Sequence, residues 1–205
     1  MNNYIHLGPS EIVAGRSFTD PDQSRADAET LWRIADNLCR ALNRLPEMPG
    51  QPRSSVDWQK FEGHDCRIII ANRERLLASN DLTIVGFFGQ RRPDADLALL
   101  EGIDDELIGE FPQHPGVLSY CSLELGDGNW GNLVVFGFPE AREHWRTSER
   151  HAEAAGKLAP GYYATIRLHN AILPGGLMSG NDLILQRTKY YDFQGSSPWY
   201  AIREF

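Results

Sequence analysis

Four side chains in the last third of the chain have the types and the spacing of a catalytic set. Tyr163, Thr165, Arg167 and His169 are alternate residues of a strand-like stretch, so they should share one face of a sheet. A histidine can serve as a general base near neutral pH, and an arginine or a tyrosine can stabilise an oxyanion. We therefore predict His169 as a base, with Arg167 and Tyr163 as oxyanion partners. The alternative is that Arg167 pairs with Glu124 of a neighbouring strand and that nothing is catalysed.

Further candidates lie on the helix predicted over residues 139–158. His144 and His151 are seven positions apart, which places them on one flank of the helix, about 10 Å apart along its axis. One metal ion cannot span that distance unaided, so no metal site is predicted. We predict His151 as a second candidate base and His144 as a residue bordering a substrate pocket. The alternative is that both histidines are solvated or cap a helix end.

Aromatic side chains complete the predicted pocket. Trp145 lies on the apolar face of the same helix, and Phe87 and Tyr120 lie on two neighbouring strand-like stretches. Aromatic rings beside His, Arg and Tyr suit a planar, oxygen-bearing substrate, which the rings would hold by stacking. We predict a small aromatic substrate bound by Trp145, Tyr120, His144 and Phe87, without a cofactor.

The second half of the chain supplies the elements that must position these residues. Strands are predicted over 82–90, 117–125, 132–138 and 162–173, and helices over 94–111 and 139–158. This order is that of the α+β ferredoxin-like split βαβ fold, an antiparallel sheet with helices on one face. The other face would leave apolar side chains exposed, so we predict that two sheets pair into a dimeric α/β barrel.

The flanking segments are predicted as additions to this domain. Residues 1–79 form an N-terminal helical extension or lid, with an amphipathic helix at about 25–45. The short apolar run at 67–79 fits a helix or a strand leading into a turn, and we favour the helix. Residues 80–175 form the ferredoxin-like domain. Residues 176–205 form a C-terminal tail with a strand at 182–192 that is a candidate for exchange with a partner.

The segments NLVVFGF, PEAREHWRTSERHAEAA and YYATIRLHNAIL resemble the antibiotic-biosynthesis-monooxygenase-like superfamily of dimeric α/β barrels. The resemblance covers residues 80–173 and includes Trp145, Ser148 and His151 at matching helix positions. It implies a homodimer that performs a cofactor-independent oxidation, cyclisation or isomerisation of an aromatic or polyketide-like compound. Its haem-degrading members imply an alternative, a haem protein with atypical ligation, for example by His151. A third possibility is a non-catalytic ligand-binding dimer.

The composition and net charge of the chain argue against nucleic acids and membranes as binding partners. The 205 residues are 41% hydrophobic, which is typical of a folded domain, and the net charge is −8. Nucleic acids and anionic membranes attract basic surfaces, so we predict neither as a partner. No apolar run approaches the roughly 18–20 residues of a membrane span. No secretory signal is recognisable, so we predict a cytoplasmic protein.

Overall fold

The computed structural model describes residues 4–44, 55–96 and 102–205. Within these ranges nine strands form one sheet in the order β1-β9-β8-β7-β4-β6-β5-β3-β2. Only β1 and β9 pair in parallel among the described strands, so the sheet is mixed. The strands are β1 (Ile5–His6), β2 (Ser55–Phe61), β3 (His64–Ile70), β4 (Leu82–Arg91), β5 (Val117–Glu124), β6 (Trp130–Phe136), β7 (Tyr163–Leu173), β8 (Ile184–Asp192) and β9 (Trp199–Glu204).

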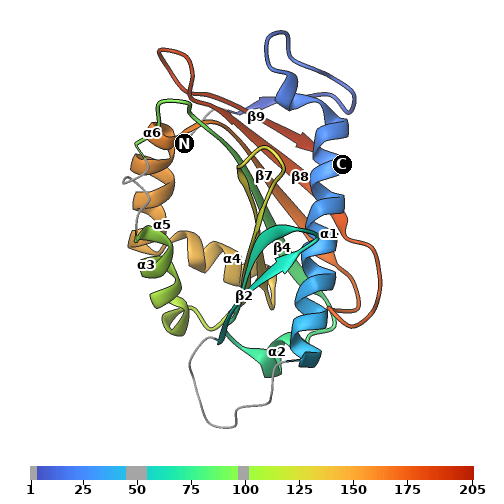
Figure 1. Cartoon of the computed structure of the whole chain (residues 1–205). Helices are drawn as coiled ribbons and strands as arrows, with labels where there is room; N and C mark the ends of the chain where they lie inside the picture. The colour runs from blue at the N-terminus through green and yellow to red at the C-terminus, as the bar shows by residue number, and fades with distance from the viewer. Residues whose placement is uncertain (1–3, 45–54, 97–101) are drawn as a thin grey trace.

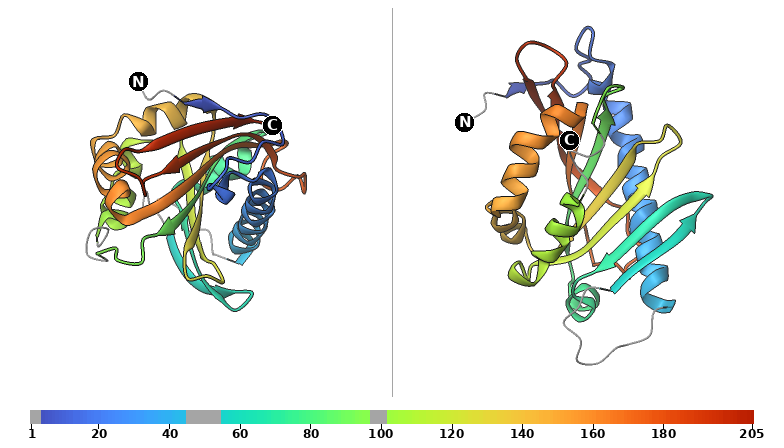
Figure 2. Two further views of the ribbon diagram at one scale, coloured as in Figure 1. Left: turned by 90° about the horizontal axis from the view of Figure 1, so that it is seen from above. Right: turned by 60° about the vertical axis from the view of Figure 1, so that its left-hand side comes forward.

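Helices cover both faces of the sheet (Figure 1 and Figure 2). The long helix α1 (Pro21–Arg44) lies across one face. The other face is covered by α3 (Ile103–Gly109), α4 (Pro139–Arg146), α5 (Glu149–Glu153), a π-helical turn (Ala154–Leu158) and α6 (Ala159–Tyr162). Shorter helices are α2 (Arg73–Ala78) and the 3₁₀ turns Ser17–Thr19 and Phe111–Gln113.

Helix α1 forms because its sequence is amphipathic, and its apolar side is buried on the sheet. Pro21 occupies the first turn, where its missing N–H is no loss, and Leu31, Ile34 and Leu38 recur along one side. These three side chains are fully buried in the largest core cluster. The helix comes very close to β4 at Gly86, where an added Cβ would lie 2.3 Å from a methyl carbon of Leu31. A side chain at position 86 would therefore force the Leu31 side chain to move.

The opposite core is centred on Trp145 of α4. Its ring packs with Phe111, Phe136 and Ile69 in a second buried cluster. The chain turns after α4, and the Ser148 hydroxyl caps α5 by accepting a hydrogen bond from the backbone N–H of His151 at 3.1 Å. The helices on this side are thus held to β3, β5 and β6.

The predicted fold class, a ferredoxin-like split βαβ domain that forms a dimeric α/β barrel, is wrong. The strands predicted at 82–90, 117–125, 132–138 and 162–173 correspond to β4, β5, β6 and β7, which lie side by side. The sheet, however, continues with β3 and β2 on one edge and with β8, β9 and β1 on the other. The result is a large open sheet with helices on both faces.

The physical reason for the error lies in α1. The apolar face for which a partner sheet was predicted is covered by this helix of the same chain, so its burial needs no second subunit. Residues assigned to an N-terminal extension provide α1 and the strands β1 to β3. The tail forms β8 and β9 of the chain's own sheet, where β8 pairs with β7.

Two of the predicted helices also differ from those in the structure. The run at 67–79, predicted as a helix, divides into the end of β3 at Ile70 and the short helix α2 from Arg73. Of the helix predicted over 94–111, the structure has α3 at 103–109, and residues 97–101 lie outside the described part of the chain. In the described ranges, the helices lack the length and apolar character needed to cross a membrane.

Candidate functional site

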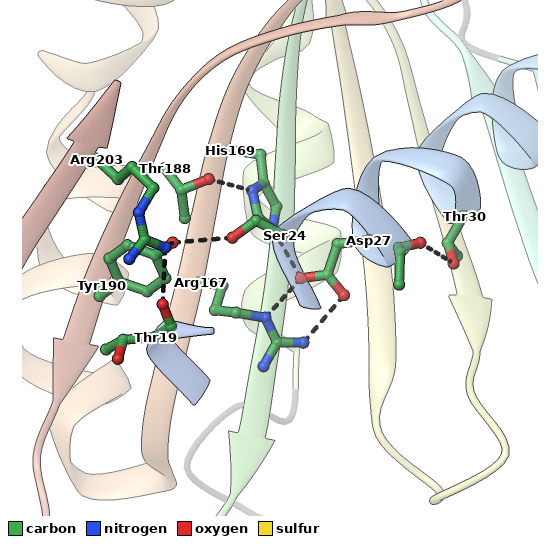
Figure 3. Close-up of polar contacts among 10 residues, drawn as sticks. Thr19, Ser24, Asp27, Thr30, Arg167, His169, Thr188, Tyr190 and Arg203 are labelled. Carbon is green, nitrogen blue, oxygen red and sulfur yellow. Dashed lines mark hydrogen bonds and ion pairs between the residues drawn. The ribbon is translucent and has the colours of Figure 1, made fainter. Parts of the chain in front are cut away.

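A buried polar network connects α1 to β7 and β8 (Figure 3). The Asp27 carboxylate on α1 accepts two hydrogen bonds from the Arg167 guanidinium, at 2.5 Å from Nε and 3.0 Å from Nη2. The same carboxylate lies 2.8 Å from Nε2 of His169, and Nδ1 of that ring lies 2.8 Å from the Thr188 hydroxyl. Arg167 and His169 come from β7, and Thr188 comes from β8, directly opposite His169.

The contacts define the protonation of His169. A carboxylate can only accept, so Nε2 carries the proton and Nδ1 accepts from the Thr188 hydroxyl. Burial lowers the pKa of His169 below its ordinary 6.5, although the hydrogen bond to Asp27 and its charge act in the opposite direction. Burial alone would raise the pKa of Asp27, but hydrogen bonds from His169 and Arg167, with the Arg167 charge, lower it overall. The network therefore holds an ionised Asp27, a charged Arg167 and a neutral His169.

A second set of buried contacts adjoins this network. The Arg203 guanidinium on β9 donates to the Tyr190 hydroxyl and to the carbonyl of Thr19, both at 2.7 Å, and to the carbonyl of Gly8 at 3.1 Å. Tyr190 in turn lies 2.9 Å from the Ser24 hydroxyl of α1 (Figure 3). The segment before α1 and the start of α1 are thereby joined to β8 and β9.

These contacts leave His169 no access to a substrate. Both ring nitrogens are hydrogen-bonded, the side chain is fully buried, and Phe88 packs edge-on against the ring at 5.5 Å. Arg167, which we considered as a partner of Glu124, is instead paired with Asp27. The predicted base and its predicted oxyanion partner thus meet in the structure, but within a closed network that attaches α1 to the sheet.

Tyr163 does not join Arg167 and His169. A β-bulge between Gln90 and Arg91 shifts the pairing of β4 with β7, so that Tyr163 lies opposite Arg91. An inserted residue reverses the alternation of side chains, so Tyr163 projects to the other face. There it packs edge-on against Phe87, with ring centres 5.2 Å apart.

The candidates on the predicted helix form a third group, also on the face opposite α1. Trp145 packs edge-on against His151 at 5.7 Å and against His114 at 5.0 Å, and His114 lies 6.0 Å from His144. Tyr120 reaches the same cluster through Phe111, 6.4 Å away. The sheet separates this group from His169, so His151 and His169 cannot act on one substrate.

His151, the residue considered as a haem ligand, is half-buried beside Trp145 and Arg146, and haem binding stays a prediction. Burial and then the charge of Arg146 lower the pKa of His151, while Glu110 acts in the opposite direction. In the described ranges no group of three or more His, Cys, Asp or Glu side chains is arranged to hold a metal ion.

Two pockets lie elsewhere on the molecule, and no histidine lines either of them. One, of about 340 Å³, lies where β4 ends beside the turn between β5 and β6. Its polar groups mostly satisfy one another: the Asn129 side chain accepts from the Arg91 backbone, Asp127 accepts from the Asn129 backbone, and Arg92 donates to the carbonyl of Phe193. This pocket is formed mainly by turn residues that hold one another in place.

The other pocket, of about 270 Å³, lies between α4 and the strands β7, β8 and β9. It is lined by Arg142, Asn170, Gln186, Arg187 and Glu204. Arg142 donates to the side-chain oxygen of Asn170 at 3.1 Å, and Arg187 pairs with Glu204 at 2.7 Å. Two guanidinium groups and two amides thus converge on one small space.

Lys189 lies beside this pocket, two residues after Arg187 and on the same face of β8. Its side chain is half-buried, and its ammonium lies 5.4 Å from the centre of the Tyr4 ring. In the described part of the chain Lys189 forms no ion pair with a carboxylate. Burial, followed by the charges of Arg146, Arg187 and Arg142, lowers the pKa of Lys189 from its ordinary 10.5, and Glu143 opposes this shift.

Tyrosines form the wall beyond Lys189. The hydroxyls of Tyr4 and Tyr191 are 3.1 Å apart, and Tyr200 packs edge-on against Tyr191 at 5.6 Å. Burial, and then the contact with Tyr4, raise the pKa of Tyr191, so its phenol stays protonated. The surface from the pocket to these rings combines surplus positive charge with aromatic area.

Comparison with protein-family models, curated proteins and solved structures gave no match. The resemblance to the monooxygenase-like superfamily therefore stays an untested prediction. The expectation of a monooxygenase-like oxidoreductase rested on a dimeric barrel that the structure does not have, and nothing found here supports it.

Sequence reasoning did not identify Asp27 of α1 or Lys189 of β8 as candidate residues. Asp27 carries no local signal, because its partners are 140 and 142 positions away. Lys189 could have been found: it alternates with Arg187 and Tyr191 along a predicted strand, in a chain that has only three lysines.

Proposed function

We propose that this protein binds a small organic monocarboxylate in the pocket lined by Arg142 and Arg187, next to Lys189 on strand β8. The observation that carries the proposal is a pocket lined by two arginines, where Arg142, Arg146 and Arg187 share only the carboxylates of Glu143 and Glu204. The charge imbalance is local, since the chain as a whole is strongly acidic.

The charges around the pocket favour a single negative charge. Arg142 and Arg146 share one carboxylate, that of Glu143, and Arg187 shares its charge with Glu204. These three guanidinium groups and two carboxylates leave one positive charge unbalanced, and burial disfavours the ammonium form of the neighbouring Lys189. A bound carboxylate would supply the missing charge and accept charge-assisted hydrogen bonds from a guanidinium. Glu204 in the wall would repel a dianion such as phosphate more strongly than a monoanion.

The size and lining fit a small ligand. A volume of about 270 Å³ is slightly below the usual range for ligand pockets. Asn170 and Gln186 offer amide donors and acceptors beside the two arginines. The tyrosines beyond Lys189 offer apolar contact to the part of the ligand that extends from the pocket.

The test is calorimetric titration of the full chain with lactate, with inorganic phosphate as a competing anion. Arg187→Gln and Arg142→Gln should each weaken lactate binding by about tenfold or more, since a hydrogen bond to a charged group contributes about 1.5–3 kcal/mol. The matched control is Arg40→Gln. Arg40 is an exposed arginine of α1, on the opposite side of the sheet, and should leave lactate binding unchanged.

A second variant gives an effect of opposite sign. Glu204→Gln removes the carboxylate that occupies Arg187, so it should strengthen lactate binding. The proposal fails if lactate does not bind the wild-type chain, or if Arg187→Gln and Arg40→Gln have equal effects. It also fails if Glu204→Gln weakens binding while the melting temperature is unchanged.

A further inference from the structure

Lys189 differs from the other two lysines of the chain. Lys60 pairs with Asp65 at 2.8 Å, and Lys157 lies 3.8 Å from Glu153; both side chains are largely exposed. Lys189 is half-buried, and its ammonium lies over the Tyr4 ring with no carboxylate of the described residues within ion-pair distance. Of the three amines, it alone lies two residues along a strand from an arginine that lines the pocket.

This environment favours the neutral amine. Desolvation disfavours the ammonium form, and the neighbouring guanidinium groups repel it further. A lysine that is desolvated beside other cations is more nucleophilic at neutral pH than an exposed one, because more of it is unprotonated. In Lys60, by contrast, the hydrogen bond to Asp65 raises the pKa and so favours the ammonium.

The placement of the arginines relative to the amine defines the ligand class. Arg187 and Lys189 are alternate residues of β8, so their Cα atoms are about 6.6 Å apart and their side chains project from the same face. The next carbon atom of a ligand whose carboxylate binds Arg187 and Arg142 would lie within reach of the flexible Lys189 side chain. In a 2-oxo acid that carbon is an electrophilic carbonyl.

Building on the proposed function, we propose that the ligand is a 2-oxo acid and that Lys189 forms a reversible imine with its carbonyl carbon. The lone pair of Nζ attacks the carbonyl carbon to give a carbinolamine. Loss of water then forms the C=N bond: the carbonyl oxygen leaves with the two hydrogens of the amine. No electrons are transferred overall, and no further reactant is needed.

The experiment is reductive trapping on the full chain. The protein is incubated with pyruvate and sodium cyanoborohydride, and the modified residues are located by peptide mass mapping. The hydride reduces the imine to a stable secondary amine, which marks the reacting lysine. Lactate, which has the carboxylate but no carbonyl, is titrated in parallel by calorimetry.

Labelling should be severalfold greater at Lys189 than at Lys157 or Lys60, because its desolvated amine is more often unprotonated and the carboxylate site holds pyruvate next to it. The Lys189→Arg variant should lose this label, whereas Lys157→Arg should retain it. Excess lactate should suppress labelling at Lys189, since it occupies the same arginines, and should leave labelling at Lys157 unaffected.

The outcomes separate the two proposals. If lactate binds but labelling at Lys189 does not exceed that at Lys157, the imine proposal is overturned and the carboxylate site stands. If neither lactate nor pyruvate binds and Lys189 is not labelled, the proposed function itself is wrong. Labelling at Lys189 that lactate cannot suppress would show that the amine reacts without the arginine site, and would also overturn the proposal.

Discussion

Replacing Asp27 tests whether the buried network attaches α1 to the sheet. The Asp27 side chain is 10% exposed, and its partners Arg167 and His169 are 19% and 0% exposed. Removing one member of a buried ion pair leaves an uncompensated charge and typically costs about 3–5 kcal/mol. Asp27→Ala should lie in the upper part of that range, because it also leaves a cavity.

Asp27→Asn should cost less, and the reason is specific to the ring beside it. The asparagine amide can donate, so His169 can move its proton to Nδ1 and accept at Nε2, with Thr188 as the new acceptor. The Arg167 guanidinium has no such alternative and loses its counter-charge. We therefore expect a loss of about 3 kcal/mol for Asp27→Asn.

The matched control is Asp36→Asn on the same helix. Asp36 pairs with Arg40, and the two side chains are 33% and 67% exposed, so this pair contributes only about 0.3–0.5 kcal/mol. Urea unfolding at pH 7, followed by circular dichroism, measures both variants on one scale. Adding Arg167→Met to Asp27→Asn should restore part of the loss, because it removes the unpaired charge. Equal costs for Asp27→Asn and Asp36→Asn would refute our account of how α1 is held.

Three further outcomes follow from the same structure. Stability measured by urea unfolding should fall as the pH is lowered from about 6.5, because His169 takes up a proton in the unfolded chain more readily than in the folded one. Below about 3.8 stability should fall again, because the pKa of Asp27 is lower in the folded chain than in the unfolded one. A flat profile from pH 7 to 5 would contradict the neutral His169 ring. Trp145→Ala should cost about 3–5 kcal/mol, and an unchanged melting temperature would show that this side chain is not core. Gly86→Ala should cost about 1–3 kcal/mol because its methyl group meets Leu31, and Leu31→Ala in the same chain should recover part of that loss.

The elements of the second half of the chain were predictable because their signals are local. The β-branched and aromatic run from Leu82 appears as β4, and the Gly-Asp-Gly-Asn turn separates β5 from β6. The architecture was not predictable, because it depends on where α1 packs. Its apolar stripe of Leu31, Ile34 and Leu38 shows that the helix is buried but not which sheet face buries it.

The candidate site was predictable only in part, for two physical reasons. Alternation correctly placed Arg167 and His169 on one face, but it could not detect the bulge at Gln90 and Arg91 that moves Tyr163 to the other. The reasoning that a buried arginine and histidine need partners was sound. The partner, Asp27, belongs to a helix whose position over this face is not indicated by any local pattern.

The side chains on one side of β8 stabilise the fold, and those on the other side are available to bind a ligand. Thr188 and Tyr190 face α1 and are fully buried, and each has hydrogen-bond partners within the protein. The donors and acceptors of such a group are already used within the protein, so its loss should affect stability before it affects ligand binding. Arg187 and Lys189 alternate with them on the other side, where they are partly accessible and where the described carboxylates do not balance the positive charge. The guanidinium groups on this side repel one another and disfavour the ammonium form of Lys189, and a bound anion would relieve that repulsion. We therefore place the functional site on the side of the sheet opposite the network that the sequence first indicated.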